Sequence, residues 1–242
     1  MVMSQWRPFG ASVPGPGHVR MGMPNQDSFL IATHLWGDVV VVSDGVGSCA
    51  NAERGSDAAC QAVVCIAEKW LETADNAESL LSGIQDDWMA RILPLDPDEC
   101  SATCLFAVCP ANRQTMTLGM LGDGMIAVLK KDGSYVELYE EKDDFFSNQT
   151  NALTKGTQIG QWQTTSLVQE ECCAVLLCTD GIADDLLPSM RKDFVRHIYL
   201  NGKECDDKTV SDELHKMLEN WPVPKHSDDK TLVCLCKYPE ET

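Results

Sequence analysis

The chain has 242 residues, of which 44% are hydrophobic, a composition typical of a globular protein with one substantial core. Its 37 acidic residues against 19 basic ones give a formal net charge of −18. Because this surplus repels phosphate backbones and anionic lipids, it disfavours nucleic acid and membrane surfaces as partners. We therefore expect a single domain over residues 1–242 that binds neither nucleic acid nor membrane.

The first part of the chain predicts a strand hairpin followed by two helices. Residues 28–34 and 38–43 are rich in β-branched and apolar residues on either side of a short turn, which is typical of paired strands. From residue 53 to 71 the apolar positions recur at steps of three and four, and this spacing predicts a helix with one buried face. A second helix is predicted over 76–92.

The remainder predicts more strands, a loop and two further helices. Four short apolar segments with turn residues between them predict a meander of strands at 102–109, 114–121, 124–130 and 134–139. Residues 141–161 have no sustained period and many turn formers, so we predict a short flap-like surface loop. The last segments predict strands at 163–170, 174–179 and 231–237 and helices at 183–200 and 208–220.

This order of elements predicts an α+β fold. Runs of strands alternating with pairs of helices suit an antiparallel sheet system that is covered by helices on its outer faces. A doubly wound parallel sheet needs regular alternation of strand and helix, which the run of strands from 102 to 139 breaks.

The cysteines and the absence of long apolar segments indicate a reduced compartment. None of the 12 cysteines forms a C-x-x-C pair, and several, such as Cys104, Cys178 and Cys234, lie inside apolar runs. There they are expected to act as small buried hydrophobic residues. No secretory leader pattern and no apolar stretch of ~18 residues is evident, so we expect a cytoplasmic protein.

Aspartates recur at the ends of the predicted strands. Asp44, Asp123 and Asp180 each precede a glycine after an apolar run, Asp228 precedes such a run, and Asp27 begins the first strand. A single Asp-Gly pair is most simply a turn. Five carboxylates at the ends of neighbouring strands would instead crowd together, which raises their pKa values unless a cation is present.

The ligand chemistry of these carboxylates predicts hard metal ions. Oxygen ligands without histidine or cysteine favour Mn²⁺ or Mg²⁺ over zinc. Two such ions about 3.5–4 Å apart can hold a hydroxide for in-line attack on phosphorus. The glycine after each aspartate is expected to let backbone and substrate come close.

Five short motifs occur in order along nearly the whole chain: NQD at 25–27, DGVG at 44–47, SATCLFAV at 101–108 with LGDG at 121–124, CTDGIADDL at 178–186, and DDKTLVCL at 228–235. In this order they resemble the metal-dependent Ser/Thr protein phosphatases of type 2C, the PPM family, in their compact bacterial form. Each motif is weak alone, but the ordered set is specific. The resemblance implies a four-layer α/β/β/α sandwich with two central antiparallel sheets flanked by helices.

The resemblance also implies roles for individual residues. Asp44 would bridge two metal ions, and the carbonyl oxygen of Gly45 would be a further ligand. Asp180 and Asp228 would complete the shell of the first ion. Asp27 would lie beside the second ion, mostly through water. The implied cofactors are two Mn²⁺ or Mg²⁺ ions, and the resemblance leaves a third ion open.

Two positions depart from the family pattern. Asp123 matches an aspartate that, with Asp180, holds a third and weaker ion in bacterial relatives, but the usual arginine after it is absent because the sequence reads GDGM at 122–125. A phosphate-binding arginine stands shortly before the NQD motif in many relatives. Arg20, seven residues before Asp27, is assigned that role by resemblance.

Two histidines are open to two interpretations. His18, close to Arg20, could donate a proton to a leaving alkoxide or bind phosphate, or it could be an exposed loop residue. His226 could orient Asp228, or it could be a loop residue without such a role.

The function implied by the resemblance is hydrolysis of phosphoserine and phosphothreonine in proteins by a hydroxide held between the ions, reversing the action of a partner Ser/Thr kinase. Asp44, Asp180, Asp228 and Arg20 would carry the reaction. The alternative is a catalytically weak or inactive module of the same fold that binds phosphoproteins, which the missing arginine after Asp123 favours. A third hypothesis is an acidic scaffold or cation-buffering module, in which the aspartates only close turns.

Overall fold

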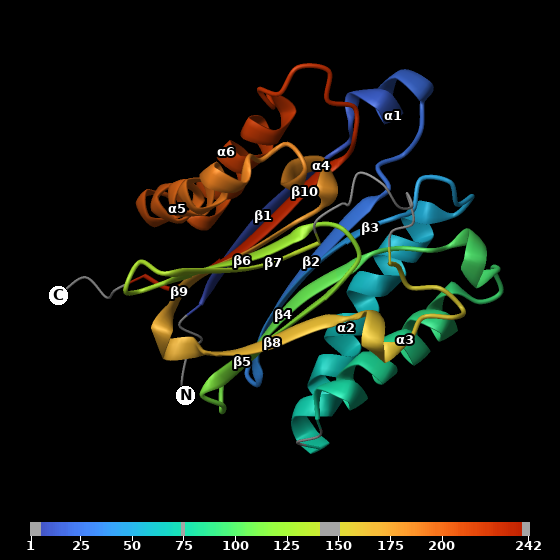
Figure 1. Ribbon diagram of the computed structural model, residues 1–242, viewed down its shortest axis with the longest axis horizontal. Coiled ribbons are helices and arrows are strands. Elements are labelled where there is room, and N and C mark those ends of the chain that lie inside the picture. The colour runs from blue at the N-terminus through green and yellow to red at the C-terminus, as the bar shows by residue number, and fades with distance from the viewer. Residues whose placement is uncertain (1–5, 74–75, 141–150, 239–242) are drawn as a thin grey trace.

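The computed structural model describes residues 6–73, 76–140 and 151–238. Two five-stranded antiparallel sheets are stacked face to face between two layers of helices (Figure 1). The predicted α+β class and the four-layer α/β/β/α sandwich are therefore confirmed.

Every neighbouring pair of strands in the two sheets is antiparallel. The first sheet has the order β1 (Arg7–Val13), β10 (Lys230–Cys236), β9 (Cys172–Cys178), β6 (Met125–Lys130) and β7 (Tyr135–Tyr139). The second sheet has the order β2 (Asp27–His34), β3 (Gly37–Asp44), β4 (Cys104–Pro110), β5 (Thr115–Leu121) and β8 (Gln163–Val168).

Six α-helices accompany the sheets in the described residues. They are α1 (Pro16–Met21), α2 (Ala52–Thr73), α3 (Ala77–Ile92), α4 (Asp180–Ala183), α5 (Pro188–Glu204) and α6 (Asp207–Glu219). The second sheet is covered by α2 and α3, and the first sheet by α5 and α6 (Figure 1). Single 3-10 turns occur at Pro97–Glu99, Ile159–Gln161 and Gln169–Glu171. None of the described helices is long and apolar enough to cross a membrane.

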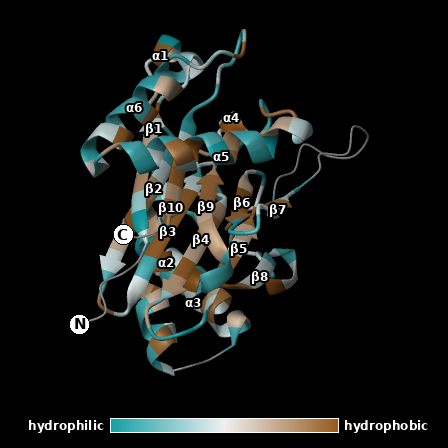
Figure 2. Ribbon diagram, turned by 90° about the vertical axis from the view of Figure 1, so that its left-hand side faces the viewer, coloured by the Kyte–Doolittle hydropathy of each residue, from teal (hydrophilic) through white to brown (hydrophobic). Residues whose placement is uncertain are grey.

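The run of four valines in β3 shows why a central strand here is hydrophobic throughout. Val39 and Val41 pack against α2 and α3, whereas Val40 and Val42 pack against the other sheet. All four are fully buried because successive side chains of a strand point to opposite faces, and both faces of this sheet are covered. Figure 2 shows the hydrophobic colour concentrated on the strands, between the more polar helices.

Three features differ from the sequence predictions. Neither β1 nor α1 was predicted. The helix predicted at 183–200 corresponds to α5, which begins only at Pro188, because proline is favourable in the first turn of a helix. The short helix α4 over Asp180–Ala183 was not predicted. Of the predicted loop at 141–161, residues 141–150 lie outside the described part, and Leu153 pairs with Ala102 in an isolated bridge.

Candidate functional site

The five strand-end aspartates lie at one end of the two sheets. In the second sheet, Asp27 is the register partner of Asp44. In the first sheet, Met125 and Leu232 both pair with Cys178. Since Asp123 and Asp228 lie just before the first two of these residues and Asp180 just after the third, the register brings them to the same end.

A hydrogen bond joins the two sheets at this end. Thr179, between β9 and α4, donates its hydroxyl to a carboxylate oxygen of Asp27 at 2.8 Å, and its own oxygen accepts the backbone N–H of Thr231 at 3.1 Å. A threonine of the first sheet therefore orients a carboxylate of the second.

Burial and mutual repulsion perturb the two aspartates of the second sheet. Burial raises the pKa of Asp27 to about 7, against the opposing effect of the Thr179 hydroxyl. The pKa of Asp44 is raised well above its usual range, first by burial and then by the charges of Asp27, Asp180 and Asp228. Three neighbouring carboxylate charges thus act on Asp44 at this end, and a cation placed among them would reverse the effect.

The donor set fits Mg²⁺ or Mn²⁺, because these hard ions prefer carboxylate and carbonyl oxygens. Within residues 6–73, 76–140 and 151–238, no three histidine, cysteine or acidic side chains already form a group able to hold a metal ion. The carboxylates therefore provide the donor chemistry and the charge for metal ions, but not a finished ligand shell.

A sixth aspartate, which sequence reasoning missed, holds the site together. The carboxylate of Asp229 accepts the backbone N–H of Gly15 at 2.6 Å and that of Gln26 at 2.7 Å. A third contact of this carboxylate, at 2.8 Å, is with Nδ1 of His18 on α1. Asp229 is almost completely buried, so this one side chain ties the start of β10 to the connections on both sides of α1. The sequence did offer one signal, the two adjacent aspartates at 228 and 229. Neighbouring side chains at the start of a strand point to opposite sides, so the two carboxylates were bound to have different surroundings.

The two histidines can now be placed. His18 is bound to Asp229, so the interpretation as an exposed loop residue is wrong. Nδ1 of His226 lies 3.1 Å from the ammonium of Lys230, which donates to the carbonyl oxygen of Asp228 at 3.0 Å. His226 is therefore linked to Asp228 through the side chain of the buried Lys230. The third of the predicted residues near this end, Arg20, is exposed on α1.

The glycines after the aspartates serve backbone packing. A Cβ atom on Gly45 would lie 2.4 Å from the carbonyl oxygen of Ala52, and one on Gly181 would lie 2.0 Å from the carbonyl oxygen of Asp229. Both distances are far below a normal contact. These two glycines let the aspartate-bearing turns pack directly against neighbouring backbone, as expected, and the close approach of substrate stays a prediction.

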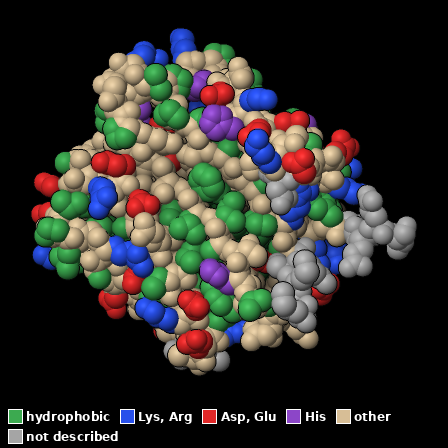
Figure 3. Space-filling model, turned by 180° about the vertical axis from the view of Figure 1, so that it is seen from behind, with side chains coloured by type: hydrophobic (Ala, Val, Ile, Leu, Met, Phe, Trp, Pro, Cys, Tyr) green, Lys and Arg blue, Asp and Glu red, His purple; other side chains and the backbone are tan. Residues whose placement is uncertain are grey.

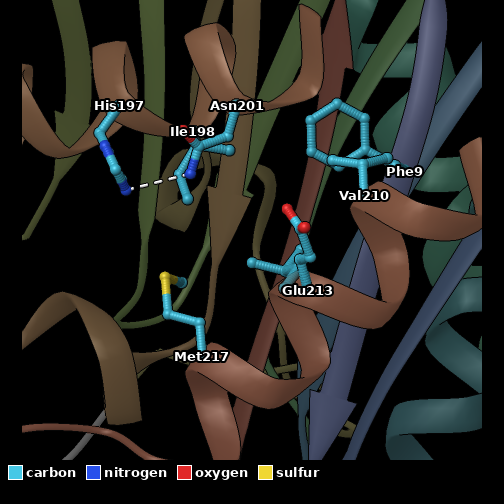
Figure 4. A pocket seen from close by; sticks show the side chains of 8 residues that line it. Phe9, His197, Ile198, Asn201, Val210, Glu213 and Met217 are labelled. Atoms are coloured by element: carbon cyan, nitrogen blue, oxygen red, sulfur yellow. Dashed lines mark hydrogen bonds between the residues drawn. The ribbon is translucent and has the colours of Figure 1, made fainter. Parts of the chain in front are cut away.

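A cavity of about 240 Å³ lies elsewhere, between α5, α6 and β1 (Figure 4). Its lining is mostly apolar, with Phe9 from β1 and Val210 and Met217 from α6, and Glu213 stands among them. None of the strand-end aspartates lines it. The cavity is therefore not the candidate site.

Comparisons with known proteins agree with this geometry. A family model described as "Protein phosphatase 2C" matches residues 14–219. No protein with a curated description matches the sequence significantly.

Solved structures with the same fold cover nearly the whole chain. A bacterial serine phosphatase has 16% identity and a TM-score of 0.68, covering 98% of this chain and 99% of its own. RsbX, solved in complex with magnesium, has 15% identity and a TM-score of 0.63, covering 96% of both chains. The photosystem II phosphatase PBCP has 14% identity and a TM-score of 0.66, covering 96% of this chain and 98% of its own. At these identities the likeness establishes the fold.

Proposed function

Because the chain belongs to the protein phosphatase 2C family, we propose that it hydrolyses phosphoserine and phosphothreonine esters of proteins with the help of divalent metal ions. The observation that carries the proposal is that the charges of Asp27, Asp180 and Asp228 all act on Asp44 at one end of the sheets. A protein keeps such repulsion in its folded state when a cation relieves it in use.

We propose the following ligands for two Mn²⁺ or Mg²⁺ ions. Asp44 would lie between the ions, the carbonyl oxygen of Gly45 would be a further ligand, and Asp180 and Asp228 would hold one of the ions. Asp27 would stand beside the other. Asp123, on the connection from β5 to β6, would help Asp180 to hold a third ion.

When bound, such ions supply Lewis acidity, which makes water a better nucleophile and neutralises phosphoryl oxygens. The chain's own residues orient the carboxylates and the backbone of the site and bind the phosphate group. Thr179 fixes the carboxylate of Asp27, and Asp229 fixes the backbone on both sides of α1. The exposed guanidinium of Arg20 can bind a phosphate group, because arginine can donate two parallel N–H bonds to phosphate oxygens.

The substrate of this reaction would be a phosphorylated protein. Its partner in the same pathway would be the Ser/Thr kinase that forms the phosphoester. We also propose that the described elements form one catalytic domain. The alternative, a module that binds phosphoproteins without hydrolysing them, retains support from the missing arginine after Asp123. The complete set of carboxylates weighs against it, because binding alone gives no reason to keep them.

Turnover of p-nitrophenyl phosphate and of a phosphothreonine peptide, with Mn²⁺, with Mg²⁺ and with EDTA, tests the proposal. We expect metal-dependent hydrolysis by the natural protein and a loss of about 10³-fold or more in Asp44→Asn. Glu171→Gln, an exposed carboxylate at the other end of the sheets, should leave turnover unchanged. Absence of turnover with either metal, with phosphopeptide still bound, would establish the binding module instead.

A further inference from the structure

Three exposed hydrophobic side chains lie close together in sequence on and just after α1. Val19 is 62% exposed, Met21 is 65% exposed and Met23 is 36% exposed. Single exposed apolar residues are common on protein surfaces, but three within five residues, in a segment beside the candidate site, are a candidate surface for an interaction. We call these three residues the α1 patch.

The α1 patch is firmly held beside the candidate site. Gly17 donates its backbone N–H to the carbonyl oxygen of Ser227 at 2.9 Å, and His18 is bound to the buried carboxylate of Asp229 at 2.8 Å. Ser227 and Asp229 flank Asp228, a proposed metal ligand. Figure 1 shows α1 next to the chain that leads into β10, at the same end of the sheets as α4.

The side chains of α1 are hardly covered by the rest of the protein. None of the residues of α1 is buried, and Figure 2 shows α1 standing outside the layers, with hydrophobic colour on part of its ribbon. The contacts that hold α1 come from Gly15, Gly17 and His18. The side chains of the patch are therefore not needed to fix the helix and are available to another molecule.

We propose that the α1 patch binds the residues that flank the phosphorylated serine or threonine of the substrate protein, and that it selects substrates with apolar residues there. This inference rests on the proposed function. A phosphoester on a polypeptide brings its neighbours along at 3.8 Å per residue, so the flanking residues must cross the rim of the site. Methionine suits such a role because its unbranched side chain adapts to different partners.

The charge of the patch agrees with this occupant. Arg20 lies between Val19 and Met21 and is exposed, in a chain whose net charge is −18. Consecutive residues of a helix point in different directions, so the guanidinium of Arg20 and the apolar side chains can contact different parts of one segment that is apolar and carries a phosphate. A segment without the phosphate would lack the partner for this arginine.

The test compares two phosphothreonine peptides of equal charge, one with leucines and one with glutamines around the phosphothreonine, and p-nitrophenyl phosphate as a substrate without flanking residues. The variant carries Val19→Thr, Met21→Gln and Met23→Gln together. The matched control is Leu35→Gln, because Leu35 is 79% exposed but lies in the turn between β2 and β3, at the opposite end of the sheets.

We expect kcat/KM of the triple variant to fall about tenfold on the leucine peptide and to stay unchanged on the glutamine peptide and p-nitrophenyl phosphate. Leu35→Gln should change none of the three. Equal losses on all substrates, or no loss on the leucine peptide, would overturn the inference. If the natural protein turned over p-nitrophenyl phosphate but did not distinguish the peptides, only the α1 patch would fail. If it turned over nothing, the proposed function would fail and the inference with it.

Discussion

Acidic side chains have opposite electrostatic surroundings at the two ends of the stacked sheets. At the end that carries α1 and α4, burial and then the charges of Asp27, Asp180 and Asp228 raise the pKa of Asp44. At the other end, carboxylates face ammonium groups. Lys130 pairs with Glu171 at 3.1 Å, and Lys237 pairs with Glu170 at 2.6 Å.

The difference separates exposed, paired charges from the partly buried charges that the proposed function uses. The acidic side chains of the paired end are mostly exposed, where ion pairs contribute little. Figure 3 likewise shows acidic and basic side chains interspersed over the back of the molecule. Like charges gathered around buried positions cost stability. Net charge alone did not distinguish these two kinds of carboxylate, but their position on the strands did.

Removing a carboxylate from the crowded end should have the largest effect. We expect Asp228→Asn to lower Mn²⁺-dependent kcat/KM on p-nitrophenyl phosphate by about 10³-fold, because a proposed ligand is lost. Its stability should change little, since Asp228 is exposed. Steady-state kinetics over a range of Mn²⁺ concentrations, together with urea unfolding, measure both quantities. A variant with natural activity would remove Asp228 from the site.

The next effect is the pH dependence of the metal-free protein. The pKa of Asp27 is 3.8 in the unfolded chain and about 7 in the folded one, so the folded state holds its proton more tightly. Stability should therefore be fully present below about pH 4 and fall as pH rises towards 7, by on the order of 4 kcal/mol.

Urea unfolding in EDTA at pH 5 and pH 8 measures this effect. The natural protein should be less stable at pH 8, and Asp27→Asn should show a smaller difference between the two conditions. Saturating Mn²⁺ should remove or reverse the loss, because the ion takes the place of the proton. Greater stability of the EDTA-treated natural protein at pH 8 than at pH 5 would show that the folded state does not favour the protonated form of Asp27.

The sequence predicted most of the fold because its strands are hydrophobic on both faces. The run Val39 to Val42 could only be a covered strand, and α2 and α3 begin and end within two residues of their predictions. β1 was missed because its segment, RPFGASV, includes proline and glycine, both unfavourable in strands. Its pairing with β10 is a long-range contact that no local pattern reveals.

The candidate site divides in the same way. The strand-end aspartates could be found from sequence, because a carboxylate after an apolar run is a local signal. Asp229 could not, because its partners Gly15 and Gln26 are more than 200 residues away along the chain. The burial of Lys230 was equally hidden, since lysine is seldom buried without a partner.

A smaller loss is expected when the buried carboxylate of Asp229 is changed. Asp229→Asn replaces one acceptor oxygen by an N–H donor, which must then face the backbone N–H of Gly15 or of Gln26, or His18. An unsatisfied buried donor costs about 1–3 kcal/mol. Urea unfolding should show this loss, and calorimetric titration should show weaker Mn²⁺ binding. Asp228→Asn is the neighbouring control, since it should lose metal binding without the loss of stability.

The smallest effect is expected at the paired end. Glu171→Gln removes the ion pair with Lys130, but the carboxylate is 57% exposed, and exposed pairs are screened by water and salt. The urea midpoint should stay within experimental error at both low and high salt, and Mn²⁺-dependent turnover should equal that of the natural protein. A measurable loss of turnover would mean that the two ends are coupled through the sheets. The carboxylates at the end that carries α1 and α4 could then no longer be treated as a separate electrostatic unit.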